Sequence, residues 1–122
     1  MSRSAQEVAA RQEIADLSGA YMRGLDRLDP EALANVFHPD AYTDYGFYRG
    51  DMDGFVRMCM SALKGHLANH HMLGQINIEL EGDVAFGEVY FQAFHRIVVS
   101  GEERDLCISG RYVDRYELRD AA

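Results

Sequence analysis

The first 28 residues carry apolar positions at the period of an α-helix. These positions recur at intervals of three, four or six residues and are Val8, Ile14, Leu17, Tyr21, Leu25 and Leu28. They form one stripe on a helix of about 20 residues or more. Ser4 and Glu7 have the spacing of a capping box, so we expect the helix to begin beside them. Asp26 follows Leu25 and lies about 100° round the helix, at the flank of the stripe.

Two shorter helices are predicted from their start signals. Asp29-Pro30-Glu31 combines a capping residue, proline at the first helical position and an early acid. Asp51 caps a further helix that we expect to end at Lys64-Gly65. Between the two helices, residues 40–48 are aromatic and loosely alternating, which predicts a strand with Gly46 as a turn or bulge point. A turn is expected at Arg49-Gly50.

From Leu67 onward the pattern changes to that of strands. Three long strands are predicted, at residues 68–80, 84–99 and 104–118, and both connecting turns contain glycine. Helices followed by a β-meander indicate an α+β fold, with a curved antiparallel sheet covered by helices on one face. A long helix across the concave face of such a sheet encloses a pocket.

Composition limits the partners. The chain has 122 residues, the length of one domain, and a formal net charge of −8. That charge argues against binding to nucleic acid or to an anionic membrane. No apolar run is long enough to span a bilayer, and the N-terminus lacks the pattern of a signal peptide. Cys59 and Cys107 form no CxxC motif, so we expect a reducing, cytoplasmic location.

The strongest candidate chemistry is the adjacent pair His70 and His71. Neighbouring strand residues point to opposite faces, so one imidazole is expected to face inward. Strict alternation with Ile76 and its even-numbered neighbours selects His70, whereas a bulge at Gly74 selects His71. From the residues alone both remain open, as does a reading in which one histidine is solvated and the other merely bonded to a neighbour.

Other side chains have competing interpretations. His95 shares the parity of Val89 and Ala93, so it is either a satisfied core residue or a second pocket histidine. Tyr21 is either packing or a hydroxyl at a cavity edge. Asp26 stands near the C-terminal end of the helix, where the helix dipole disfavours an acid, so we expect its carboxylate to have a bonding partner. Arg111 belongs to a polar strand face or holds an anionic substrate group.

The sequence lacks the motifs of a metal site, a serine hydrolase and a nucleotide-binding site. No HExxH or paired Cys/His spacing is present, so we expect no metal. A GxSxG elbow is absent, which argues against a serine hydrolase. GxGxxG and GxxxxGK are also absent, so nucleotide binding is not expected, and we predict no cofactor.

The sequence resembles the SnoaL-like group of the nuclear transport factor 2 fold. The resemblance rests on the segments 19–26 (GAYMRGLD), 29–33 (DPEAL), 71–78 (HMLGQINI) and 110–117 (GRYVDRYE). It implies a single domain, a cone made of one curved sheet closed by N-terminal helices. The group includes scytalone dehydratase, bile acid 7α-dehydratase and hexachlorocyclohexane dehydrochlorinase.

The resemblance also implies a site. Asp26 and His71 match the aspartate and histidine of a proton-transfer dyad, and Tyr21 matches a pocket tyrosine. His95 falls near a second pocket histidine of some members. Tyr21 and His95 would donate hydrogen bonds to the substrate. We further expect four residues to contact substrate: Tyr48, Phe55, Met58 and Arg111.

The resemblance favours a cofactor-independent lyase or isomerase, dehydratase-like, acting on a small hydrophobic ring compound. Alternatives are a non-catalytic binding or dimerisation domain of the same fold, and a polyketide cyclase with the same dyad. The family continues past the segment that ends at residue 120 into a further strand, so we expect the domain at residues 1–122 to lack its final strand. Tyr90, Phe94 and Tyr112 are expected on the outer sheet face, where they favour a homodimer or homotrimer.

Overall fold

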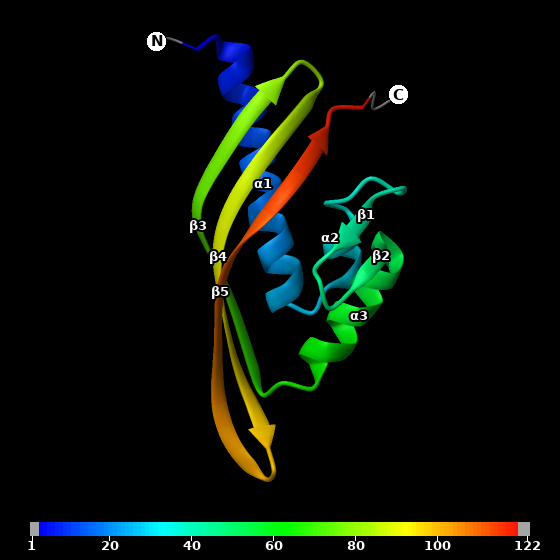
Figure 1. The fold of residues 1–122 in the computed structure, drawn as a ribbon, viewed down its shortest axis with the longest axis vertical. Coiled ribbons are helices and arrows are strands. Elements are labelled where there is room, and N and C mark those ends of the chain that lie inside the picture. The colour runs from blue at the N-terminus through cyan, green and yellow to red at the C-terminus, as the bar shows by residue number, and fades with distance from the viewer. Residues whose placement is uncertain (1–2, 120–122) are drawn as a thin grey trace.

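The fold of residues 3–119 is described by a computed structural model (Figure 1). Within these residues three helices and five strands follow one another. In order they are α1 (Ala5–Asp26), α2 (Pro30–Ala34), β1 (Tyr42–Asp44), β2 (Arg49–Asp51), α3 (Met52–Lys64), β3 (Ala68–Glu81), β4 (Val84–Val99) and β5 (Glu102–Glu117).

All three helices begin where the capping signals predict. The Ser4 hydroxyl accepts a hydrogen bond from the backbone N–H of Glu7 at 3.1 Å. The side chains of Asp29 and Asp51 cap α2 and α3 in the same way. Each cap satisfies a backbone donor that has no partner inside its helix. The local sequence therefore fixes the start of every helix.

The three long strands form one curved antiparallel sheet in the order β3-β4-β5. Gly82 and Gly101 have φ of 63° and 79° in the connecting turns, a conformation that glycine adopts without steric cost. The helix α1 lies against this sheet, mainly along β3 (Figure 1). This confirms the α+β prediction. Closure into a cone is not seen within residues 3–119, because β1 and β2 form a separate two-stranded sheet.

Two details of the prediction are wrong. Arg49 and Gly50 do not form a turn, because they pair with β1 as part of β2, and the chain reverses at Gly46 with φ of 80°. Tyr112 does not lie on the outer face of the sheet. It pairs with Val89, a buried residue of the inner face, and its ring stacks on Phe91 with centroids 4.3 Å apart.

A compact core fixes the end of α1. Its buried members come from all three helices and are Met22, Leu25, Leu33, Phe55, Val56, Cys59 and Leu63. A Cβ on Gly24 would lie 3.0 Å from the backbone nitrogen of Leu33, so α1 and α2 approach closely only because glycine stands there. The last turn of α1, which ends at Asp26, is therefore held in a defined position against the sheet.

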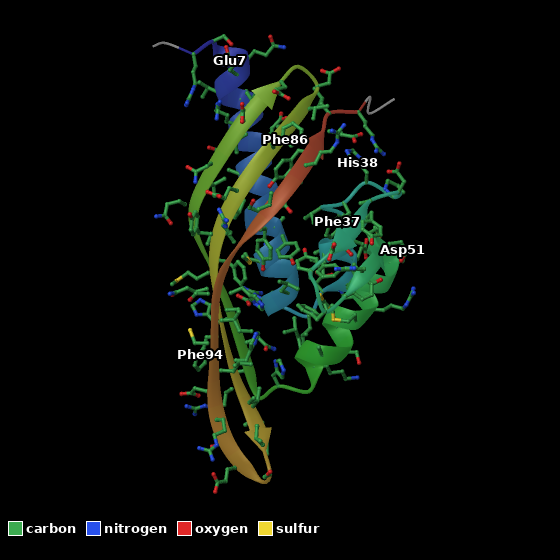
Figure 2. All side chains as sticks on the ribbon, viewed as in Figure 1. Glu7, Phe37, His38, Asp51, Phe86 and Phe94 are labelled. Atoms are coloured by element: carbon green, nitrogen blue, oxygen red, sulfur yellow. The ribbon has the colours of Figure 1, made fainter. Side chains whose placement is uncertain are left out.

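The two faces of the sheet differ in character. Phe94 lies on the face turned away from the helices, whereas Phe37 packs on the helical side (Figure 2). The β4–β5 hairpin extends past the helices (Figure 1). Within residues 3–119 no helix is long and apolar enough to cross a membrane.

Candidate active site

Asp26 and His71 form a close pair between the end of α1 and the strand β3. The ring Nδ1 of His71 lies 2.7 Å from Oδ1 of Asp26, and the backbone N–H of His71 donates to the same oxygen at 2.9 Å. The His71 side chain is 6% exposed and that of Asp26 is 25% exposed. Because a carboxylate accepts, Nδ1 carries a proton, and in the neutral ring Nε2 keeps its lone pair.

A β-bulge decides which histidine faces inward. The register of β3 against β4 shifts between Leu73 and Ile76, so the parity of the strand changes at Gly74-Gln75. His71 consequently shares the inner face with Leu73 before the bulge and with Ile76 after it, while His70 is exposed. The bulge expected at Gly74 is confirmed, and strict alternation would have selected the wrong residue.

His95 is the second buried imidazole of the site. It is 5% exposed, and its ring centroid lies 5.3 Å from that of His71. Its Nδ1 lies 2.7 Å from Oδ1 of Asn69, and the centroid of the His66 ring lies 4.7 Å from its own. Burial, followed by the nearby His66 and His71, lowers the pKa of His95, and Asp26 opposes this in part. The lowered pKa favours the neutral form of the His95 imidazole.

Tyr21 belongs to an aromatic cluster packed against the core. Its hydroxyl is 3.0 Å from that of Tyr45, and its ring packs on Phe55 and edge-on to Tyr112. Burial raises the pKa of Tyr21 far above its ordinary value, so the phenol stays protonated. Within residues 3–119 no hydrogen bond joins Tyr21 to His71.

Three of the residues expected to contact substrate lie in or against the hydrophobic core. Phe55 is 1% exposed and fills the core, where the ring of Tyr45 stacks on it at 4.5 Å. Tyr48 and Met58 pack against that core, and the hydroxyl of Tyr48 donates to the backbone oxygen of Asp51. All three side chains therefore lie in or against the hydrophobic core.

Arg111 is not brought to the inner face. It pairs in register with Tyr90, an outward residue of β4, and its guanidinium bonds to the Glu88 carboxylate on the surface. The reason is strand parity, because Gly110 and Tyr112 on either side of Arg111 face inward.

Four polar residues of the inner region were not singled out from the sequence. Asn69 and His66 bond to each other beside His95. Asp114 and Tyr116 lie on the inner face of β5, where the Tyr116 hydroxyl donates to Asp114 and burial raises the pKa of that carboxyl. Asn69 has the parity of His71, so the bulge that turns His71 inward also turns Asn69 inward.

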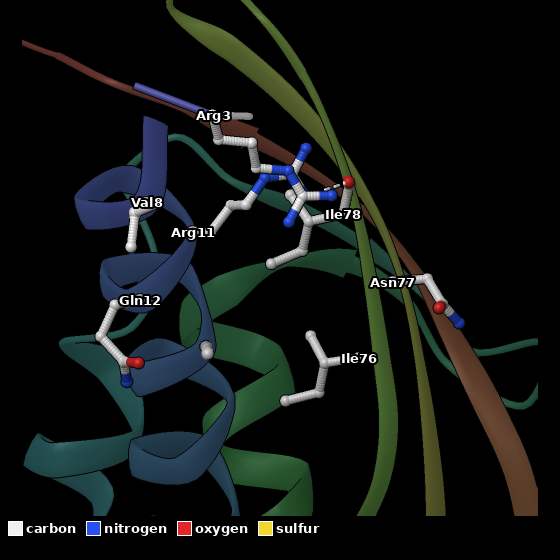
Figure 3. Close-up of a pocket in the computed structure, with 8 residues that line it drawn as sticks. Arg3, Val8, Arg11, Gln12, Ile76, Asn77 and Ile78 are labelled. Atoms are coloured by element: carbon white, nitrogen blue, oxygen red, sulfur yellow. Dashed lines mark hydrogen bonds between the residues drawn. The ribbon is translucent and has the colours of Figure 1, made fainter. Parts of the chain in front are cut away.

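Neither of two hollows in the described part of the chain includes the dyad. One, of about 500 Å³, lies between the start of α1 and β3 and is bordered by Arg3, Val8, Arg11 and Ile76 (Figure 3). Arg11 donates there to the backbone oxygen of Ile78. Within residues 3–119 no cluster of His, Cys, Asp and Glu has the arrangement of a metal site.

Comparison with known proteins identifies the family. The model of the SnoaL-like domain matches residues 6–122, nearly the whole chain. The chain belongs to the SnoaL-like domain family. This confirms the resemblance noted from the sequence.

Relatives of this SnoaL-like chain are found by sequence and by structure. It is 30% identical over 115 residues to an uncharacterised protein of Mycobacterium tuberculosis strain H37Rv, covering 91% of this chain and 76% of the relative. A hexachlorocyclohexane dehydrochlorinase of Novosphingobium barchaimii has a TM-score of 0.82 at 20% identity, covering 95% and 81% of the two chains. A proposed scytalone dehydratase of Novosphingobium aromaticivorans has a TM-score of 0.81 at 20% identity, covering 93% and 77%. These structural matches establish the fold.

Proposed function

We propose that this SnoaL-like protein is a cofactor-independent lyase or isomerase that acts on a small hydrophobic ring compound. The observation that carries the proposal is the 2.7 Å contact between Nδ1 of His71 and Oδ1 of Asp26. This contact fixes one tautomer of the imidazole and leaves Nε2 as a base. The ring is nearly excluded from water, which is the setting in which a histidine takes a proton from carbon rather than from solvent.

Dehydration of a ring hydroxy-carbonyl compound is the reaction we favour. Nε2 of His71 takes the proton from the carbon next to the carbonyl, and the electrons of that C–H bond form the new C=C bond. The C–O bond of the hydroxyl breaks, and the departing oxygen takes the proton back from the imidazolium as water leaves. Asp26 stabilises the imidazolium between these two transfers. No redox partner is needed, since the carbon skeleton loses only water.

The structural relatives support an elimination. One is named a dehydrochlorinase and the other a proposed dehydratase, so their names describe loss of hydrogen chloride and of water. Loss of hydrogen chloride or of water takes a hydrogen from one carbon and a leaving group from its neighbour, and a base such as Nε2 of His71 can take that proton. At 20% identity these matches establish the fold alone, and the reaction is inferred here from the dyad.

A second candidate is a binding domain without chemistry. The hollow beside Arg11 favours it, because this space lies away from the dyad and is bordered by Val8 and Ile76 (Figure 3). A small apolar molecule held there would need neither Asp26 nor His71. Binding that is unchanged in a His71→Ala variant, with no turnover of any compound tested, would favour this candidate.

The test compares two neighbouring histidines. Wild type, His71→Ala and His70→Ala are assayed against a panel of cyclic hydroxy-ketones, and the absorbance of the conjugated enone product is followed. His70 is the matched control, because it is adjacent but exposed on the outer face. We expect His71→Ala to lose about 10²–10⁴-fold in rate, the usual contribution of a general base, and His70→Ala to keep its rate. Equal rates in all three proteins would refute the dyad.

A further inference from the structure

Asn69 lies at the centre of a second hydrogen-bonded group beside the dyad. Its Oδ1 is 2.7 Å from Nδ1 of His66 and 2.7 Å from Nδ1 of His95. Its Nδ2 donates at 3.0 Å to the backbone oxygen of Leu63, near the end of α3. The amide is therefore used at both ends, and the contact to Leu63 fixes which end faces the histidines.

This arrangement determines where the two imidazoles carry their protons. An amide oxygen only accepts hydrogen bonds, so a nitrogen that bonds to it must donate. Nδ1 of His66 and Nδ1 of His95 are therefore both protonated. In a neutral ring the proton on Nδ1 leaves Nε2 with its lone pair. Within residues 3–119 no hydrogen bond reaches Nε2 of His95, and this atom is not among the fully buried unpartnered ones.

The surroundings of His95 favour its uncharged form. The titratable groups that face it are His66 from the segment after α3, His71 from β3 and Asp26 from α1. On β5 the residue paired with it is Leu106, which carries no charge. Burial and the two histidines disfavour the protonated ring, and only Asp26 favours it. A neutral His95 with its proton on Nδ1 offers an acceptor at Nε2, which reverses the donor role expected from the sequence.

We propose that Asn69 is a positioning residue that holds His95 in the Nδ1–H tautomer, so that its Nε2 accepts a hydrogen bond from a substrate hydroxyl beside His71. The proposal rests on the proposed function and narrows its substrate class. The ring compound carries a free hydroxyl donor close to the carbon that His71 deprotonates. A carbonyl or ether oxygen at that position cannot donate to Nε2.

The tautomer is measured without any substrate. Long-range ¹H–¹⁵N correlation spectra of the imidazoles distinguish a protonated Nδ1 from a protonated Nε2. In the wild-type protein above the pKa of His95 we expect the Nδ1–H pattern for His95 and His66. An Nε2–H pattern for His95 would overturn the proposal, whatever the outcome of the turnover assays.

Three variants separate positioning from folding. Asn69→Leu removes the acceptor, and we expect His95 to show the Nε2–H form or a mixture. Asn69→Asp keeps the acceptor and adds a charge, so His95 should retain Nδ1–H while its pKa rises by about 1–3 units. Asn77→Leu is the control, because Asn77 is exposed on the other face of the same strand. If Asn69→Leu does not fold, the Asn69→Asp titration decides. An unshifted His95 pKa in Asn69→Asp, or an unchanged His95 tautomer in folded Asn69→Leu, contradicts the positioning role of Asn69.

The substrate requirement has its own readout. For any hydroxy-ketone that the enzyme dehydrates and that carries a second hydroxyl, the methyl ether of that second hydroxyl is assayed beside it. We expect the ether to react at least several-fold more slowly, since a net hydrogen bond of about 1 kcal/mol corresponds to about a fivefold change. Equal rates for the two compounds would overturn the donor requirement while leaving the dyad intact.

Discussion

Replacing Asp26 with alanine removes the acceptor of two hydrogen bonds. Both reach Oδ1, from the backbone nitrogen of His71 at 2.9 Å and from its Nδ1 at 2.7 Å. A hydrogen bond to a charged group contributes about 1.5–3 kcal/mol, so the upper limit for the pair is about 3–6 kcal/mol. Water reaches the partly exposed carboxylate side but hardly reaches the ring, which is 6% exposed. We therefore expect the free energy of unfolding to fall by about 2–4 kcal/mol.

The assay is urea unfolding followed by circular dichroism. A loss of that size is a large part of the 5–15 kcal/mol typical of a small domain (about 0.1 kcal/mol per residue), so the midpoint should shift clearly. Asp16→Ala is the matched control, because Asp16 is on the same helix and, among residues 3–119, accepts only from the exposed Gln12 side chain. We expect it to change stability by about 0.5 kcal/mol or less. Equal midpoints for the two variants would refute the importance of the Asp26 contacts.

Three further predictions concern other parts of the molecule. The folded-state pKa of His95 is lowered from 6.5, so the unfolded chain binds more protons just below that pH. The free energy of unfolding should therefore fall as the pH drops below 6.5. The same pH slope in His95→Gln would contradict this. Arg111→Ala should leave turnover unchanged and alter stability by about 1 kcal/mol or less, since Arg111 pairs with Glu88 on the surface; lost turnover would place it in the site. Exposed Tyr90 and Val113 on the outer face favour a homodimer or homotrimer, to be measured by analytical ultracentrifugation, and a monomer at every concentration would oppose it.

Local signals in the sequence were sufficient to predict the helices and the long strands. Capping residues such as Ser4, Asp29 and Asp51 act within a few residues of themselves, so helix starts are readable without knowledge of the fold. Long alternating runs bounded by Gly82 and Gly101 likewise identified the strands of the meander. Gly46 was expected as a turn or bulge point, but a turn was wrongly expected at Arg49-Gly50, because β1 and β2 are only three residues long, too short for alternation to show.

Which face of the sheet a side chain takes, and which residues it contacts, depended on how the strands pair. Alternation alone selected His70, and only a bulge against β4 turned His71 inward. Arg111 and Tyr112 exchanged their expected faces, since the parity of β5 is fixed by its register with β4. The role of Asn69 could not be read locally either, because its oxygen joins a histidine three residues away to one on another strand.

The central claim is that Asp26 makes His71 a base for carbon. It is tested most directly by the kcat of Asp26→Asn on a hydroxy-ketone that the wild-type protein dehydrates, with folding checked by circular dichroism. The amide keeps the shape of the carboxylate but removes its charge and can present an N–H to the ring. We predict a fall in kcat of about 10²–10⁴-fold. A folded Asp26→Asn protein with wild-type kcat would contradict the claim.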